Sequence, residues 1–516
     1  MMAAKSSGRR ADRDRQARRP NAWLIGLLIG LVAGTTVAVT YPAPSVDVIK
    51  MQATDWYASM RNLVALDDRA PGNSTPGDPQ IYAAPPVSLP PEADTDDATV
   101  DNMDELVDVT APKPNTDELT AALNDEIANL EYAHRVTVAD VATGEVLYDA
   151  GGDDAIVPAS TLKLFTAVSA LEHLDTDHRF VTSAGYDPAT GAVLIGGGDG
   201  MLSTGESTGR TMGHAGLADL AQETWDAIAD QIPEGQTTVD VWADVSRYAQ
   251  PTVHPSWNEG LMTSGWVSPV YPMSTYGGFI SNPFYDKTAL EDGAVHAGGA
   301  YAQRLTELAQ ADGLEIEFQY AGQRNQPTNV DPVAEVRSAR LGQQLEYAMK
   351  QSNNMLFEIF GREAAIAAGN TPDFQGSTKT TIDTLHELGI STEHLEFIDN
   401  SGLSPNSRAT LNSMIQLYDV VISEEHLRPI AHSLAIAGYG GTMRNRLTEA
   451  PYSGIVRSKT GTLEVASSNA GLTVTADGRA LWFAVNTSGA GEDYAGARAE
   501  QDRLTQVLTD CGCSGE

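Results

Sequence analysis

The sequence predicts a chain of mixed α/β (α+β) class, in which one domain of sheet and helices is split by a large inserted region. Strand-like alternation and helical periodicity follow one another over residues 116–185 and again over 333–510. Residues 186–332 between them have a different texture, with Gly-rich loops and short strands. The length of 516 residues also exceeds what one hydrophobic core usually organises.

The first 39 residues have the pattern of a membrane-targeting segment. Residues 1–22 carry seven Lys or Arg side chains against two Asp, and residues 23–39 carry no charge. About 17 apolar residues are near the lower limit for a membrane-spanning helix. The basic flank predicts a cytoplasmic tail before a single-pass anchor, with the rest of the chain on the outer face of the cytoplasmic membrane. A cleaved signal segment, which would make the protein a secreted one, is the alternative.

Residues 40–115 have the composition of an extracytoplasmic stalk. Nine of the 26 prolines lie in residues 71–115, and acidic side chains dominate its second half. Such a segment buries too little apolar surface to offset chain entropy, so we expect an extended connection without a core.

The elements of the split domain follow in order from residue 116. Helical spacing is expected over residues 116–130 and 160–174, and a β-hairpin over 135–148. After the insertion, helical patterning resumes over 341–367, and strand-like runs fill 455–485.

Charge and metal-ligand spacing exclude several classes of function. The net charge is −36, and the basic tail makes the remaining chain still more acidic, so a nucleic-acid partner is not expected. None of the ten histidines shows the H-E-x-x-H spacing of a metallopeptidase, and the two cysteines, Cys511 and Cys513, make at most half a zinc site. We therefore expect no metal and no cofactor.

A first chemical motif, S-x-x-K, opens the helix predicted over residues 160–174. Ser160 and Lys163 are three residues apart, which places the hydroxyl and the ammonium on one helix face within hydrogen-bonding reach. A desolvated lysine of lowered pKa can take the proton of a serine hydroxyl and make it a nucleophile. A capping serine beside an exposed lysine is the alternative for this motif alone.

A second motif, K-T-G, lies in the predicted strand run near the C-terminus. Lys459 is the only one of eight lysines followed by Thr and Gly, and Thr462 comes next. A lysine beside the hydroxyls of Thr460 and Thr462 suits a free carboxylate. Gly461 would let a substrate approach the backbone closely.

The third motif, S-x-N, is weak by itself because it occurs four times, at Ser256, Ser352, Ser404 and Ser467. Position selects Ser352 with Asn354, inside the helical pattern of residues 341–367 and between the other two motifs. A helix kink or a buried amide network is the alternative.

In the order S-x-x-K, S-x-N, K-T-G, the triplet resembles that of the penicillin-binding proteins and serine β-lactamases. Within that superfamily, the chain resembles the class C low-molecular-mass penicillin-binding proteins, the D-alanyl-D-alanine carboxypeptidase/endopeptidase family. The separation of 192 positions from Ser160 to Ser352 leaves room for the large inserted domain typical of that family. The resemblance covers about residues 120–507 and includes segments 157–163, 196–199, 399–404 and 440–447. It implies a transpeptidase-like domain with a sheet flanked by helices.

The resemblance also implies the roles of the motif residues toward a peptidoglycan stem peptide. Ser160 would be acylated by the penultimate D-Ala, with Lys163 as its general base. Ser352 would relay a proton to the leaving group, and Asn354 would hold the substrate amide. β-Lactam antibiotics would acylate the same serine.

The terminal carboxylate is expected at Lys459, Thr460 and Thr462, and the oxyanion at the backbone N–H groups of Ser160 and Thr462. Asp199 matches an acid that in this family faces the free amino group of the stem peptide. Gly200 stands here in place of the family's usual proline.

Two other functions remain open from the sequence. A serine β-lactamase would need a glutamate that activates the deacylating water, and Glu396 with Asn400 has part of that pattern without its leucine. A catalytically inactive scaffold with the same fold is the other alternative, disfavoured by the intact Ser160, Lys163 and Lys459.

Overall fold

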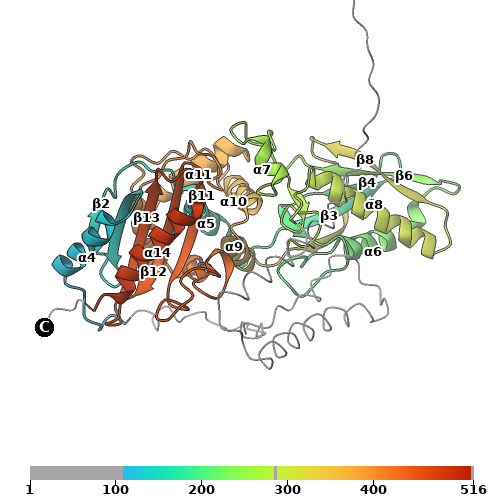
Figure 1. Cartoon of the computed structure of the whole chain (residues 1–516). Coiled ribbons are helices and arrows are strands. Elements are labelled where there is room, and N and C mark those ends of the chain that lie inside the picture. The colour runs from blue at the N-terminus through green and yellow to red at the C-terminus, as the bar shows by residue number, and fades with distance from the viewer. Residues whose placement is uncertain (1–107, 284–286, 513–516) are drawn as a thin grey trace, which may run out of the picture. The chain divides into compact units, whose positions relative to one another are not determined.

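The structure is a computed structural model that describes residues 108–283 and 287–512 (Figure 1). The predicted basic tail, the segment 23–39 and nearly all of the stalk lie outside the described residues. Within the described ranges, no helix has both the length and the apolar character needed to cross a membrane.

A six-stranded antiparallel sheet of order β10-β11-β12-β13-β1-β2 forms the first layer. Its strands come from both ends of the folded chain: β1 (Ala133–Asp140), β2 (Val146–Ala150), β10 (Ala435–Ile436), β11 (Arg457–Leu463), β12 (Ala466–Val474) and β13 (Ala480–Ser488). β1 and β13 pair from Ala133 opposite Ser488 to Asp140 opposite Leu481. The predicted hairpin is therefore β1–β2, and its first strand joins the C-terminal strands in one sheet.

Helices cover both faces of this sheet. Successive side chains of β13 point to opposite faces, and apolar residues on each face pack against a layer of helices. Leu481, Phe483 and Val485 pack with α4 (Thr116–Ala128) and α14 (Tyr494–Asp510). Trp482 faces the other layer, where Tyr418 of α12 (Leu411–Ser423) stacks on it at a ring-centroid distance of 4.4 Å. The same layer contains α5 (Lys163–Leu174), α9 (Leu341–Gln351), α10 (Asn354–Ala367), α11 (Phe374–Glu387) and α13 (Pro429–His432).

The inserted region builds a second sheet of order β8-β6-β4-β3-β9 with its own core. Its elements are β3 (Val181–Asp187), β4 (Gly191–Ile195), α6 (Leu217–Ile228), β6 (Thr238–Asp244), α8 (Gly293–Ala311), β8 (Glu317–Arg324) and β9 (Pro332–Arg337). A short pair, β5 (Asp199–Leu202) with β7 (Met273–Thr275), and α7 (Glu259–Thr263) complete it.

The sheet of the insertion begins and ends slightly outside the predicted 186–332. β3 and β9 are antiparallel neighbours, so the chain enters and leaves the insertion on adjacent strands. Local patterning could not show this boundary, because the pairing joins segments about 150 residues apart in sequence.

Candidate active site

Ser160 lies in a short 3-10 helix, Ala159–Leu162, which runs directly into α5. The residue before it, Ala159, has a φ of 48°, in the left-handed region that costs a residue with a Cβ some strain. The Asn486 side-chain amide donates to the Val157 carbonyl at 3.1 Å and so ties this turn to the sheet. Ser160 itself is only half-buried, which leaves its hydroxyl accessible to a substrate.

Lys163 is fully buried one turn beyond Ser160. Its Nζ donates to Ser160 Oγ at 2.9 Å, to Asn354 Oδ1 at 2.5 Å and to the carbonyl of Ser401. Burial lowers the pKa of the Lys163 ammonium to about 7, against the opposing charges of Asp399 and Glu358. A large fraction of Lys163 is thus neutral near pH 7, as a general base must be.

The helix predicted over residues 341–367 is interrupted at the S-x-N motif. α9 ends at Gln351, Ser352 takes a left-handed φ of 55°, and Asn353 caps α10 by accepting from the Leu356 N–H. The break turns two side chains toward the site: Ser352 Oγ accepts from Lys459 Nζ at 2.9 Å, and Asn354 Oδ1 accepts from Lys163. The Asn354 amide nitrogen donates to the carbonyl of Trp266 in the insertion, at 2.8 Å.

β11 carries the K-T-G motif and lies beside Ser160. β12 pairs with the whole strand, whereas β10 pairs only with Arg457 and Ser458, so the other edge of residues 459–463 is left without a strand partner. A Cβ on Gly461 would lie 2.7 Å from the Ser160 backbone nitrogen. The absence of a side chain at Gly461 therefore lets the backbone of Ser160 lie close to β11. From the sequence alone, the close approach of a substrate is expected at this glycine instead.

The side chains of the same strand gather hydrogen-bonding groups at that edge. Lys459 is buried, and burial together with the neighbouring charge of Lys163 lowers its pKa well below the ordinary value. Thr460 Oγ1 donates to Thr442 Oγ1 at 2.8 Å, and Thr462 Oγ1 lies 3.4 Å from Ser467 Oγ. The structure thus brings the three predicted motifs together around Ser160.

Comparison with known proteins assigns the family. A model described as the D-Ala-D-Ala carboxypeptidase 3 (S13) family matches residues 116–304 and 282–510. The chain belongs to this family. It is a serine-type D-Ala-D-Ala carboxypeptidase/endopeptidase of the class C low-molecular-mass penicillin-binding proteins, as the three motifs predicted.

Individual relatives and structures agree with the assignment. Carboxypeptidase DacB of Mycolicibacterium smegmatis is 32% identical over 446 residues, covering 84% of this chain and 91% of the relative. Carboxypeptidase Rv3627c of Mycobacterium tuberculosis is 30% identical over 419 residues, covering 78% and 86%. Penicillin binding protein 4 (dacB) from Haemophilus influenzae shares the fold, with a TM-score of 0.60 and 20% identity over 75% of this chain and 99% of that one.

Two buried acids behind Lys163 were not among the predicted site residues. Glu358 of α10 accepts the backbone N–H groups of Asn400 and Ser401, the latter at 2.8 Å. Asp399 accepts from the Trp257 indole at 2.9 Å and from the N–H groups of Gly402 and Ser404. Because the Ser401 carbonyl is itself an acceptor for Lys163, these carboxylates hold the segment that contacts the Lys163 ammonium.

Burial also raises the pKa values of both acids. The pKa of Glu358 rises to about 7, first through burial and then through the charge of Asp399, and burial raises the pKa of Asp399 as well. The sequence signal for Glu358 was a single acid in the otherwise apolar stretch Met355–Phe360, which by itself points to no particular partner.

Asp199 lies on β5, almost fully buried, and accepts the Met201 N–H at 2.7 Å. Burial raises the pKa of its carboxyl to about 7. A Cβ on Gly200 would lie 2.8 Å from side-chain atoms of Leu356 and Ile359, so the glycine that replaces the family's proline lets β5 pack closely on α10.

Glu396, on which the β-lactamase alternative depends, is exposed, and its backbone pairs with that of Arg408. Its sequence partner Asn400 is buried, with its amide nitrogen donating to Ser377 Oγ at 2.7 Å. In the described part of the chain, no hydrogen bond joins the Glu396 side chain to Ser160 or Lys163.

Proposed function

We propose that Ser160 attacks the carbonyl between the two terminal D-Ala residues of a stem peptide, with neutral Lys163 as its general base. The observation that carries this assignment is the 2.9 Å hydrogen bond from Nζ of the fully buried Lys163 to Oγ of Ser160, a residue that is only partly buried. As the Oγ–carbon bond forms, the serine proton passes to Lys163 Nζ.

In this proposal, the backbone N–H groups of Ser160 and Thr462 receive the charge that develops on the carbonyl oxygen. The support is the close approach of Gly461, the residue before Thr462, to Ser160: a Cβ on Gly461 would lie 2.7 Å from the Ser160 nitrogen. Such donors are typically worth about 3–4 kcal/mol of transition-state stabilisation each. When the peptide C–N bond breaks, Ser352 Oγ, hydrogen-bonded to Lys459, relays a proton to the leaving amine, and the proton that Lys163 took from Ser160 replaces it. Asn354 holds the substrate amide, and Thr460 and Thr462 receive the terminal carboxylate.

Water then hydrolyses the acyl-serine ester, which releases the shortened stem peptide as an acid and restores the Ser160 hydroxyl. A β-lactam enters the same path, because its strained amide replaces the D-Ala-D-Ala bond. Its ring opens onto Ser160, and the leaving amine stays attached to the acyl group.

Covalent labelling tests this assignment directly. Intact-mass analysis of the protein after incubation with penicillin should show one penicilloyl group, and the Ser160→Ala variant should show none. Ser423→Ala, at the exposed C-terminal end of α12, is the matched control and should label fully. An adduct that persists in Ser160→Ala would overturn the assignment.

We also propose that Asp199 receives the free amino group of the stem peptide. Its carboxyl lies buried beside α10, whose first residue is Asn354, and an incoming ammonium would relieve the cost of its ionisation. Asp199→Asn should lower kcat/KM for a stem peptide with a free side-chain amine, and leave the N-acetylated peptide nearly unchanged. Equal loss on both peptides would contradict this role.

We further propose that residues 23–39 anchor the enzyme at the outer face of the cytoplasmic membrane. The support is the uncharged run after a basic tail. A protease added to spheroplasts should degrade the folded domains and spare the first 22 residues. Recovery of a soluble protein that begins near Val39 would indicate signal cleavage instead.

A further inference from the structure

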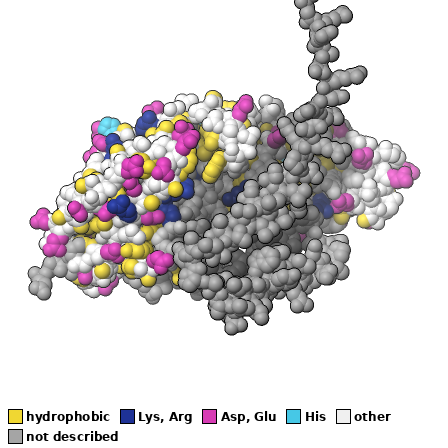
Figure 2. All heavy atoms as spheres, viewed as in Figure 1, with side chains coloured by type: hydrophobic (Ala, Val, Ile, Leu, Met, Phe, Trp, Pro, Cys, Tyr) yellow, Lys and Arg dark blue, Asp and Glu magenta, His cyan; other side chains and the backbone are white. Residues whose placement is uncertain are grey.

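The terminal carboxylate of a D-Ala-D-Ala peptide needs a cation, and Lys459 is poorly placed to be the only one. Its ammonium is 1% exposed and already donates to Ser352 Oγ and to the Thr460 carbonyl, at 2.9 and 2.7 Å. The proximity of Lys163 further disfavours a full charge on it. The protein as a whole is strongly acidic and repels an anionic substrate; Figure 2 shows acidic side chains spread over the visible face and few basic ones.

Arg498 of α14 brings a second cation to the end of the K-T-G strand. Its Nη2 lies 3.5 Å from Thr462 Oγ1, the hydroxyl predicted to receive the carboxylate. A carboxylate oxygen that accepts from Thr462 can therefore lie within hydrogen-bonding distance of this guanidinium. The planar fork of an arginine suits a carboxylate better than a single ammonium does.

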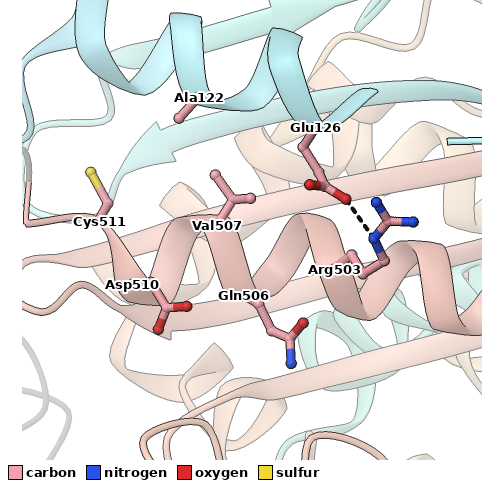
Figure 3. A pocket seen from close by; sticks show the side chains of 7 residues that line it. All are labelled: Ala122, Glu126, Arg503, Gln506, Val507, Asp510 and Cys511. Atoms are coloured by element: carbon pink, nitrogen blue, oxygen red, sulfur yellow. Dashed lines mark ion pairs between the residues drawn. The ribbon is translucent and has the colours of Figure 1, made fainter. Parts of the chain in front are cut away.

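Two other arginines, one on α14 and one that contacts this helix, are already paired with acidic side chains. Arg446 makes a bidentate pair with Asp502, at 2.8 and 3.0 Å. Arg503 pairs with Glu126 at 2.6 Å in a surface pocket between α4 and α14, as the dashed line in Figure 3 marks. Among the described residues, no acid lies within ion-pair distance of Arg498, so its charge is available to a ligand.

We propose that Arg498 is a substrate-binding residue, which receives the α-carboxylate of the terminal D-residue together with the Thr462 hydroxyl. This proposal rests on the proposed function, because it takes the substrate to lie along β11 with its carboxylate at Thr462. It makes Arg498 a determinant of specificity for substrates whose terminal carboxyl group is free.

The test compares a stem peptide ending in D-Ala-D-Ala with the same peptide as its C-terminal amide. In Arg498→Gln, kcat/KM for the acid should fall about tenfold, mainly through a higher KM. A tenfold change corresponds to the lower end of what a hydrogen bond to a charged group contributes. The amide should be turned over as by the wild type. Arg498→Lys should restore part of the lost kcat/KM. Arg503→Gln, five residues along the same helix, is the control and should leave kcat/KM for both peptides unchanged.

Ionic strength gives a second readout, since salt screens an exposed charge. The preference for the acid over the amide should weaken with salt in the wild type and be insensitive to salt in Arg498→Gln. A parallel loss on both peptides would mean a structural role, and no loss on either would mean no contact; both results overturn the proposal. If the Arg498 proposal is overturned, penicilloyl labelling of Ser160 in Arg498→Gln would still support the proposed function of Ser160.

Discussion

The charge state of Lys163 makes the pH dependence of acylation the sharpest test of the mechanism. Only neutral Lys163 can take the Ser160 proton, and burial places its pKa at about 7. The neutral fraction is then roughly a tenth at pH 6, half at pH 7 and nine-tenths at pH 8. The second-order rate constant for acylation by penicillin should therefore rise about tenfold from pH 6 to pH 8 and level off above it.

The assay is rapid quenching followed by intact-mass measurement of the penicilloyl adduct, across pH 6 to 10. A lysine with its ordinary pKa would instead give a rate that climbs about tenfold per pH unit up to about pH 10. That profile, or a rate independent of pH, would refute Lys163 as the base.

A variant of the buried acid Glu358 tests in which direction the pH–rate profile of acylation shifts when the charge near Lys163 changes. The negative charge of Glu358 raises the pKa of Lys163, so Glu358→Gln should lower this pKa and move the acidic limb to lower pH. The shift should be only partial, because the pKa of Glu358 is itself about 7 and the acid is partly protonated there. The glutamine oxygen still accepts an N–H of residues 400–401, and a limb that moves to higher pH would contradict this account.

Three further substitutions test other parts of the account. Lys163→Arg keeps a cation that cannot deprotonate, so acylation should fall at least ~100-fold while the circular dichroism spectrum is retained. Glu396→Gln should leave both acylation and the slow release of the penicilloyl group unchanged; a trapped adduct that the wild type hydrolyses quickly would indicate a β-lactamase. Asp140→Ala removes the ion-pair partner of Arg479, whose side chain is 7% exposed, and should lower the free energy of unfolding in urea by about 3 kcal/mol.

The parts of the site that could be predicted were those encoded by short spacing. The spacing of three positions from Ser160 to Lys163 already implies a shared helix face, and K-T-G is rare enough among eight lysines to be informative by itself. These features depend on residues close together in the sequence, so the spacing of residue types is enough to predict them.

The parts that could not be predicted depend on contacts between distant segments. The left-handed turn at Ser352 interrupts a helical pattern that is otherwise continuous, and it is fixed by Asn353 and by packing rather than by the periodicity of residues 341–367. Glu358 meets the backbone of residues 400–401 only after α10 and the following loop fold together. Arg498 likewise reaches Thr462 only because α14 packs across the sheet.

The pairing of β1 with β13 has a consequence for the biogenesis of this enzyme. The Asp140–Arg479 contact joins residues 339 apart in the chain, and β11 supplies half of the site only after residue 457 has been made. Ser160 therefore emerges from the ribosome long before the K-T-G strand with Thr462 exists. Synthesis must be nearly complete before the sheet can close, and such non-local pairing is slow to form. A truncation that removes the last 60 or so residues, and β11 with them, should thus leave a long polypeptide that carries the serine and lysine but forms no active site.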